Sequence, residues 1–332
     1  MAKLRRIVAR RLVNAVITIF GIIVLNYVLI RLMPGNPGLT LTPHDPKYAG
    51  VAALNREIFG LDKPPWDQFV IYLQKLVTGD WGISYWWKTP VINILAQDLG
   101  WTLLLVGTST VLTILVGMVV GSYAAWRRGK PFDLVSTGLT IFLYGMPTFW
   151  MGIMLKLTFS PFFRPFSWWP TLPGTGYYDD SLGNWAWDLA HISSTLQHLI
   201  LPALTLTVGS IAGISLVMRS SLIDVMTEDF VLTARAKGLS ERQILRRHIF
   251  PNGLPPMVSL IAMDMAFILG GAYQTEWVFG YRGIGWETIN AIDKLDYPLL
   301  QFIVVVGGVA IVIANLVSDF ILLWLDPRIK IA

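Results

Sequence analysis

Six apolar stretches, each long enough to cross a bilayer, constrain the fold of this chain more than any other feature. They run from about Val8 to Ile30, Trp101 to Trp126, Leu134 to Phe159, Leu199 to Met218, Leu254 to Ala272 and Leu300 to Leu325. A membrane-spanning helix needs about 20 mostly apolar residues. The composition agrees, because 14% of the 332 residues are charged, against about 25% in soluble globular chains. The sequence therefore predicts an all-α polytopic membrane protein with six transmembrane helices.

Basic residues divide these stretches by membrane side. They lie before the first stretch, in the gap at 127–130, in the gap at 219–247 and after the sixth, whereas the intervening segments are rich in Asp and Glu. By the positive-inside rule the basic segments and both termini are cytoplasmic. This segregation leaves no basic domain, so the net charge of +5 does not indicate nucleic-acid binding. The first stretch is too long for the apolar part of a signal peptide, and we expect it to remain as a helix.

The predicted topology divides the chain into four parts. Residues 1–30 form the cytoplasmic N-terminus and first helix, and residues 31–100 form a large extracytoplasmic loop region. Residues 101–325 form the core with a cytoplasmic loop at 219–252, and residues 326–332 form a cytoplasmic tail. Short amphipathic helices are expected in the outer region at Val51–Phe59, Trp66–Val77 and Val91–Leu99. Pro147 lies inside the third span and should kink it, because proline cannot donate the helix hydrogen bond.

The cytoplasmic loop has the clearest local signals. A helix is predicted over Glu228–Lys237, and Gly238 suits the left-handed turn that follows a helix. Ser240 can cap a second helix that runs to about Phe250 and stops at Pro251. Leu239, Ile244, Leu245 and Ile249 supply apolar positions for burial. On physical grounds alone, a solvated basic loop that only sets topology remains as plausible as a functional element.

This loop resembles the "EAA" loop of permease subunits of ABC importers. In that family an Ala-containing turn, a fixed Gly and a Pro thirteen residues later mark the coupling helix, and Ala234, Gly238 and Pro251 stand at this spacing. Leu232 and Thr233 replace the usual Glu and first Ala, as in the dipeptide/oligopeptide branch. Segments 31–37, 79–84, 296–298, 315–319 and 325–328 also resemble that branch, with Asn36 where Asp is more usual. The long first outer region resembles the first of its two paired permeases.

The resemblance implies a fold, a set of partners and a mechanism. The fold would be that of a type I ABC importer permease in a prokaryotic cell membrane. The partners would be a second permease, two cytoplasmic ATP-binding subunits, an extracytoplasmic substrate-binding protein and the bilayer. Residues implied in coupling to the ATPases are Ala234, Arg235, Lys237, Gly238, Leu239, Ile244, Leu245 and Pro251.

Cofactor chemistry is expected on those partners and not on this chain. The sequence has no Gly-x-x-x-x-Gly-Lys phosphate loop, since Ala124 stands where the first Gly would precede Gly129-Lys130. The chain itself is therefore expected to be no enzyme and to bind no cofactor, with ATP and magnesium on the partner subunits. No cysteine is present, which excludes a disulfide framework and Cys-ligated metals.

Candidate substrate-path residues are few. Asp264 is the one acid deep in an apolar stretch, where intramembrane ionisable residues often mark pathways, although a hydrogen bond between helices is the more common reason for such a residue. Many of the 14 Trp lie near predicted membrane surfaces, as in an interfacial aromatic belt. The pairs Trp168/Trp169 and Trp185/Trp187 are the best candidates for stacking on a flat ligand. Gly117-x-x-x-Gly121 and Gly209-x-x-x-Gly213 would permit close helix approach.

Two other classes and one cargo question stay open. A membrane enzyme would need a catalytic cluster, but the four His lie in loops or at span edges and no H-E-x-x-H or G-x-S-x-G motif is present. A stand-alone channel or secondary transporter often has an internal repeat, and none is evident. Within the resemblance, di- or oligopeptides are the default cargo, and the Trp-rich second outer loop favours oligosaccharides. Nickel is disfavoured, because the spans hold no His or Cys cluster.

Overall fold

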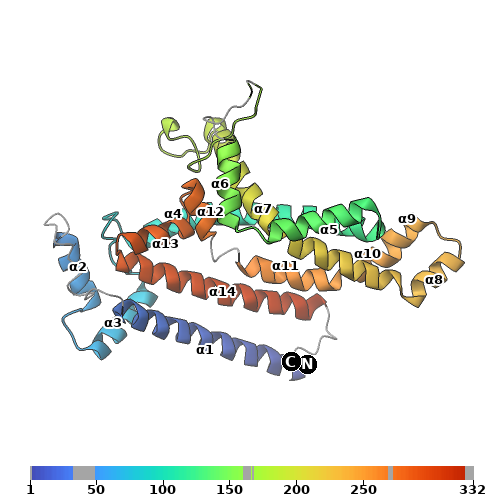
Figure 1. Ribbon diagram of the computed structural model, residues 1–332. Coiled ribbons are helices and arrows are strands. Elements are labelled where there is room, and N and C mark those ends of the chain that lie inside the picture. Colours follow the sequence, from blue (N-terminus) through green and yellow to red (C-terminus); the bar gives the residue numbers. More distant parts are fainter. Residues whose placement is uncertain (1, 33–48, 160–165, 167, 268–271, 326–332) are drawn as a thin grey trace. The chain divides into compact units, whose positions relative to one another are not determined.

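The computed structural model describes residues 2–32, 49–159, 166, 168–267 and 272–325, and these are almost entirely helical (Figure 1). The long helices are α1 (Ala2–Leu32), α4 (Val91–Trp126), α7 (Leu189–Met226) and α14 (Tyr297–Leu325). The shorter ones are α2 (Ala49–Phe59), α3 (Pro65–Thr78), α5 (Pro131–Tyr144), α6 (Thr148–Phe159), α8 (Asp229–Ala236), α9 (Glu241–Ile244), α10 (Phe250–Gly253), α11 (Pro255–Phe267), α12 (Tyr273–Phe279) and α13 (Ile284–Asp293).

Four helices are long and apolar enough to cross a membrane, or five if one bent pair forms a single span. The four contain Val8–Leu32, Val91–Trp126, Leu189–Met226 and Tyr297–Phe320. The six spans predicted from the sequence are therefore confirmed only in part. The predicted fifth span, Leu254–Ala272, corresponds to α11, which has 13 residues and is too short by itself. Its last residues lie outside the described part of the chain.

The predicted third span is broken and not merely kinked at Pro147. Helices α5 and α6 meet at 103°. Gly145 ends α5, with its N–H bonded to the carbonyl oxygen of Ile141 at 3.1 Å. Pro147 has no N–H and disfavours the helical conformation at the residue before it, Met146. A glycine and a proline two residues apart thus end one helix and start another in a new direction.

The expected separate helix at Val91–Leu99 is wrong, because this segment is the first part of α4. No proline stands between Val91 and Trp126, and a single glycine at 100 is tolerated inside a helix at modest cost. The two other helices expected in this region are present as α2 and α3. Gly79, in the left-handed conformation with φ of 76°, ends α3.

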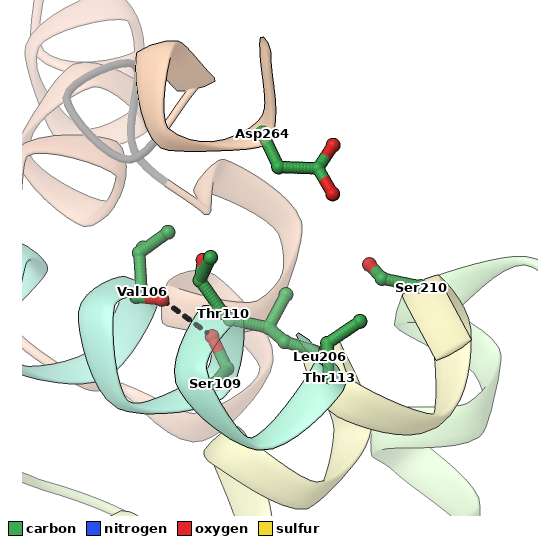
Figure 2. A pocket seen from close by; sticks show the side chains of 7 residues that line it. All are labelled: Val106, Ser109, Thr110, Thr113, Leu206, Ser210 and Asp264. Atoms are coloured by element: carbon green, nitrogen blue, oxygen red, sulfur yellow. Dashed lines mark hydrogen bonds between the residues drawn. The ribbon is translucent and has the colours of Figure 1, made fainter. Parts of the chain in front are cut away.

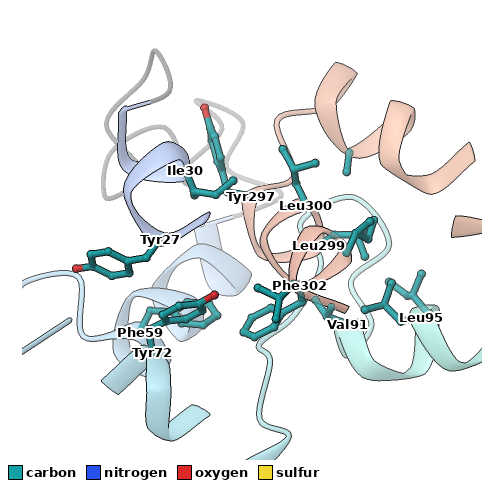
Figure 3. Close-up of a cluster of buried hydrophobic side chains, with 14 of the residues drawn as sticks. Tyr27, Ile30, Phe59, Tyr72, Val91, Leu95, Tyr297, Leu299, Leu300 and Phe302 are labelled. Carbon is teal, nitrogen blue, oxygen red and sulfur yellow. The ribbon is translucent and has the colours of Figure 1, made fainter. Parts of the chain in front are cut away.

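The chain divides into two compact units, each with its own apolar core. The first unit comprises Met1–Leu103, Leu269–Trp277 and Arg282–Leu316. Its core joins α1, α2, α3, the start of α4, α13 and α14 (Figure 3). Tyr72 and Phe302 are at most 1% exposed, and Trp81 stacks on Phe302 with ring centroids 5.0 Å apart.

Polar contacts hold the short helix α3 against the long helices of this unit. Asn26 of α1 is buried, and its amide group donates to the Tyr72 hydroxyl at 3.1 Å and to the Gln301 carbonyl oxygen at 3.0 Å. The Tyr27 hydroxyl donates to the Pro65 carbonyl oxygen at 2.6 Å. Buried polar groups must be paired in this way to avoid the cost of desolvation. The same bonds therefore specify where α3 sits on α1 and α14.

The second unit comprises Leu104–Ile268, Val278–Tyr281 and Val317–Ala332, and it is built around α7. Helices α5, α6, α10 and α11 all pack on α7. The Arg219 guanidinium binds the buried Asp133 carboxylate through two contacts, at 2.5 and 2.8 Å. Gly129 N–H also donates to that carboxylate at 2.8 Å. This pair holds the start of α5 and the turn before it against α7.

Candidate functional site

The loop between α7 and α11 folds into the two-helix segment that the sequence predicts. Helix α8 ends at Ala236, and Gly238 has a φ of 74°, in the left-handed region that favours glycine. The Ser240 side chain accepts from Gln243 N–H while the Gln243 side chain accepts from Ser240 N–H. This capping box satisfies two backbone donors at the start of α9. The turn at Gly238 and the Ser240 cap are thus confirmed.

The sequence predicts that the second helix stops at Pro251, but in the structure the helix continues past this residue. Residues Leu245–Ile249 form a π-helical turn, and α10 continues through Pro251 to Gly253. In the π turn the Phe250 N–H bonds to the Leu245 carbonyl oxygen. The wider turn changes the hydrogen-bond register immediately before the proline. Pro251 has no N–H to donate, and it falls in the first turn of α10, where a backbone N–H needs no partner within the helix. Such π turns are rare and occur frequently at functional sites.

Buried side chains fix this segment to the body of the second unit. Val231, Ile244 and Ile249 are fully buried with Met218 and Leu222 of α7. Ser221 Oγ donates to the Gly253 carbonyl oxygen at 2.8 Å. Each fully buried aliphatic side chain contributes about 1.5–3 kcal/mol by leaving water. The loop and α7 are therefore packed together in one core.

The structure divides the predicted coupling residues into two groups. Ala234 and Ile244 are buried inside the chain, and Leu239 and Leu245 are half-buried against the same core. Their side chains hold the segment in place and present little surface to another subunit. Exposed members of the set are Arg235, Lys237, Gly238 and Pro251. Arg235 is already paired with Glu241, with Nε to Oε1 at 2.9 Å.

Asp264 lies beside a small polar cavity inside the second unit (Figure 2). The cavity has a volume of about 140 Å³. Its hydroxyl groups come from Ser109, Thr110 and Thr113 of α4 and Ser210 of α7, and Asp264 comes from α11. Asp264 stands about 14 Å along the helix axis from Pro255, at 1.5 Å per residue. The hydrogen bond between helices that could have explained Asp264 is not found among the described residues.

The four predicted tryptophans belong to two separate aromatic groups. Trp169 donates its Nε1–H to the Thr158 carbonyl oxygen at 2.8 Å and stacks on Phe159. Trp168 stacks on Phe166 and is 71% exposed. Trp185 meets Trp187 edge to face, and Trp187 is 86% exposed. Of these four tryptophans, Trp168 and Trp187 therefore have the indole rings that are most accessible to a ligand.

Sequence reasoning missed a buried carboxylate in the first unit. Glu276 of α12 is fully buried, and it accepts from Thr102 Oγ1 and from Trp286 N–H, both at 3.0 Å. A Cβ on Gly283 would come within 2.6 Å of Glu276 Oε2. The turn between α12 and α13 thus closes around this carboxylate, and burial raises the pKa of Glu276. The sequence feature that could have indicated this buried carboxylate is the glycine-rich run at 280–285, which an ordinary exposed outer loop does not explain.

A second buried acid lies close to aromatic and basic side chains. Glu287 of α13 accepts from Trp87 Nε1–H at 3.0 Å, and Arg282 Nη2 lies 3.8 Å from its other oxygen. The Arg282 guanidinium also stacks 4.7 Å from the centre of the Trp87 ring. Burial raises the pKa of Glu287 as well. These contacts tie the segment before α4 to α13 within the first unit.

Comparison with known proteins decides the family. Residues 117–331 match the family described as "Binding-protein-dependent transport system inner membrane component". The chain belongs to this family of ABC importer permeases. It is 30% identical to the dipeptide transport system permease protein DppB of Alkalihalophilus pseudofirmus, over 97% of this chain and 98% of the relative.

Further relatives agree with this chain in length, and a solved structure agrees with it in fold. The chain is 34% identical to the probable peptide ABC transporter permease protein y4tP of Sinorhizobium fredii, and 32% identical to the glutathione transport system permease protein GsiC of Escherichia coli. Each match covers 97% of this chain and 98% of the relative. The MetNI methionine ABC transporter, in an inward-facing conformation, has a chain of the same fold, with a TM-score of 0.53 and 16% identity over 70% of this chain and 96% of that chain. The protein is thus a multi-pass inner-membrane permease component.

Proposed function

We propose that the chain is one of two paired permease subunits of an ATP-driven importer for di- and oligopeptides. The observation that carries the proposal is the similarity to dipeptide, peptide and glutathione permeases over nearly the whole length of both chains. In this proposal the chain is the first of the two paired permeases. A substrate-binding protein delivers cargo from outside, and cargo crosses between the two permeases.

The proposed topology has six spans with both termini in the cytoplasm. Helices α5 and α6 form one broken span, and the apolar stretch that contains α11 forms another. A large extracytoplasmic region precedes the second span and contains α2 and α3. The placement of basic residues at 3–11, 127–130, 219–247 and 328–330 supports this orientation.

Energy enters, in this proposal, through the segment from α8 to α10. Two partner subunits bind ATP and magnesium, and their closure displaces the exposed face of this segment. Because Ile244 and Ile249 are packed against α7, a displacement of the segment is passed to α7 as a rigid-body shift. Arg235, Lys237, Gly238 and Pro251 present the contact surface, and Ala234, Leu239, Ile244 and Leu245 keep it rigid.

The substrate path is proposed to run past Asp264. The place of this acid deep in the apolar stretch Leu254–Ala272 and the hydroxyls that line the cavity beside it support that route. Trp168, Trp169, Trp185 and Trp187 would stand at its outer end. The exposed rings of Trp168 and Trp187 favour one alternative cargo, an oligosaccharide, because a sugar face stacks on an exposed aromatic ring.

Reconstitution tests this function. The chain, its paired permease and the ATPases are placed in proteoliposomes with the binding protein, and uptake of a radiolabelled dipeptide is followed. Uptake is expected only with ATP, with both permeases and with the binding protein. Peptide transport by the purified chain alone, with no ATPase added, would contradict the proposal. If unlabelled cello- or xylo-oligosaccharides inhibit uptake and unlabelled dipeptides do not, the cargo is an oligosaccharide, which is the alternative named above.

A further inference from the structure

The cavity beside Asp264 has an unusual balance of groups for the middle of a membrane protein. Four hydroxyl-bearing residues and one carboxylate line it from three helices, with Val106 and Leu206 as the apolar part of the wall. Ser109 Oγ already donates to the Val106 carbonyl oxygen at 2.9 Å. Among the described residues, the hydroxyls of Thr110, Thr113 and Ser210 have no hydrogen-bond partner. They therefore have oxygen lone pairs available to a donor.

The Asp264 carboxylate also lacks a counter-charge. No hydrogen bond or ion pair to it occurs in the part of the chain that the structure describes, and Figure 2 shows no bond between it and the other side chains that line the cavity. Of the three helices that line the cavity, α4 and α11 contain no Lys, Arg or His, and the basic residues of α7, His191, His198 and Arg219, stand at least nine positions along the chain from Ser210. A carboxylate at membrane depth is costly unless a cation or hydrogen-bond donors face it. The arrangement therefore leaves a place for a cationic partner that the described residues do not supply.

Size and donor geometry distinguish the kinds of cation. A calcium ion takes 6–8 oxygen ligands at 2.3–2.6 Å, and one carboxylate with hydroxyls dispersed over two helices does not provide such a cage. An alkylammonium group has three N–H donors. One can bind the carboxylate and the others the hydroxyls, while the attached carbons contact Val106 and Leu206. The volume of about 140 Å³ exceeds the roughly 30 Å³ share of one water, so it accepts an amino group together with its carbon.

We propose that this cavity is a transient subsite for the primary ammonium group of the transported molecule, with Asp264 as its counter-charge. The inference rests on the proposed function, because it assigns a chemical group of the cargo to one point of the path. During passage the free amino terminus of a peptide leaves water, and the carboxylate and hydroxyls replace part of its hydration.

The test compares two cargoes in two permeases. Alanyl-alanine carries an ammonium group, and propionyl-alanine has a hydrogen in its place. Each is supplied with saturating binding protein to the complete reconstituted importer, containing either the natural chain or the Asp264→Asn variant. The same binding protein serves both permeases, so its own selectivity cancels in the ratio of rates. Asp224→Asn, which neutralises an exposed acid of α7 away from the cavity, is the matched control.

The expected result is a specific loss. Asp264→Asn slows uptake of alanyl-alanine by about tenfold or more, because a charge-assisted hydrogen bond is lost, and leaves uptake of propionyl-alanine unchanged. Asp264→Glu restores part of the rate. Equal slowing of both cargoes would overturn the subsite and indicate a contact with another subunit instead. No slowing of either cargo would also overturn it.

A second measurement applies if the natural importer does not carry propionyl-alanine. The ratio of alanyl-alanine uptake by the natural chain to that by Asp264→Asn is measured as pH rises through the pKa of an α-amino group, about 7.7–8.0. The ratio is expected to fall toward one as the ammonium loses its proton, and a constant ratio would refute the subsite. Failure of the proposed function is distinguishable, because the natural importer would then take up no peptide with ATP at any pH.

Discussion

Substitution of Gly121 by alanine should separate two helices that the structure brings into unusually close contact. A Cβ at Gly121 of α4 would come within 2.9 Å of the Met218 Cβ on α7 and closer still to the Ser215 carbonyl oxygen. Ordinary contact begins at about 3.4 Å, so the helices must move apart by about 0.5–1 Å. The obstacle includes backbone, which cannot rotate away as a side chain can. Overpacking of this kind costs about 1–3 kcal/mol, and the upper half of that range applies here.

The assay is thermal unfolding of the purified chain in detergent, where contacts with other subunits do not contribute. Gly121→Ala is expected to lower the Tm by about 3–4 °C. Gly213→Ala is the matched control, because Gly213 belongs to the same kind of Gly-x-x-x-Gly pair but has no atom within 4 Å of its Cβ position. That variant should be neutral or gain about 0.5–1 kcal/mol from helix propensity. Equal effects at both positions would refute the assignment of close packing to Gly121.

Three further predictions follow from single groups. Gly238→Val should reduce uptake per ATP hydrolysed, because a left-handed conformation costs a β-branched residue about 1–2 kcal/mol, whereas Gly238→Asn should stay near normal in the same coupled assay. Asp133→Ala should cost about 3–5 kcal/mol in unfolding experiments by leaving the Arg219 guanidinium unpaired, and the double variant with Arg219→Ala should be less unstable than the sum of the single changes. Burial raises the pKa of Glu276, so the folded chain holds the carboxyl proton more tightly than the unfolded chain. The stability of the fold should therefore fall as pH rises from the ordinary pKa of 4.5 through the raised pKa. Glu276→Gln should flatten this slope in melting curves recorded from about pH 5 to 8.

Features set by local chemistry could be predicted from the sequence. The turn at Gly238 and the cap at Ser240 depend on residues within a few positions of one another, and they appear as expected. Helices α2 and α3 likewise follow their hydrophobic periodicity. The π turn at Leu245–Ile249 could not be predicted, because it depends on how Ile244 and Ile249 pack against α7. That packing also explains why Ala234 and Ile244 face the core and not a partner.

Features of the fold that depend on long-range contacts could not be predicted from the sequence. Two glycine pairs have identical spacing, but of these four glycines only Gly121 would bring a Cβ closer than 3.0 Å to backbone, because the contact depends on which face of α4 meets α7. The size of the bend at Pro147, 103°, depends on the packing of both α5 and α6 against α7. The sequence places Glu276 in an acid-rich segment between apolar stretches, whereas its burial depends on Thr102 and on Trp286, ten residues away. For Asp264, its depth in the apolar stretch follows from the sequence, and the hydroxyls beside it are known only from the structure.

The coupling role of the segment from α8 to α10 is tested most directly by cross-linking. The chain has no cysteine, so a single cysteine placed at the exposed Arg242 can carry a photoreactive maleimide label. A cysteine at Val77 of α3, which is 87% exposed, is the control in the region proposed to lie outside the cell. In the assembled importer, position 242 is expected to cross-link to an ATPase subunit and position 77 is not. Comparable cross-linking from position 77, or none from position 242 in complexes that hydrolyse ATP and take up peptide, would contradict the account.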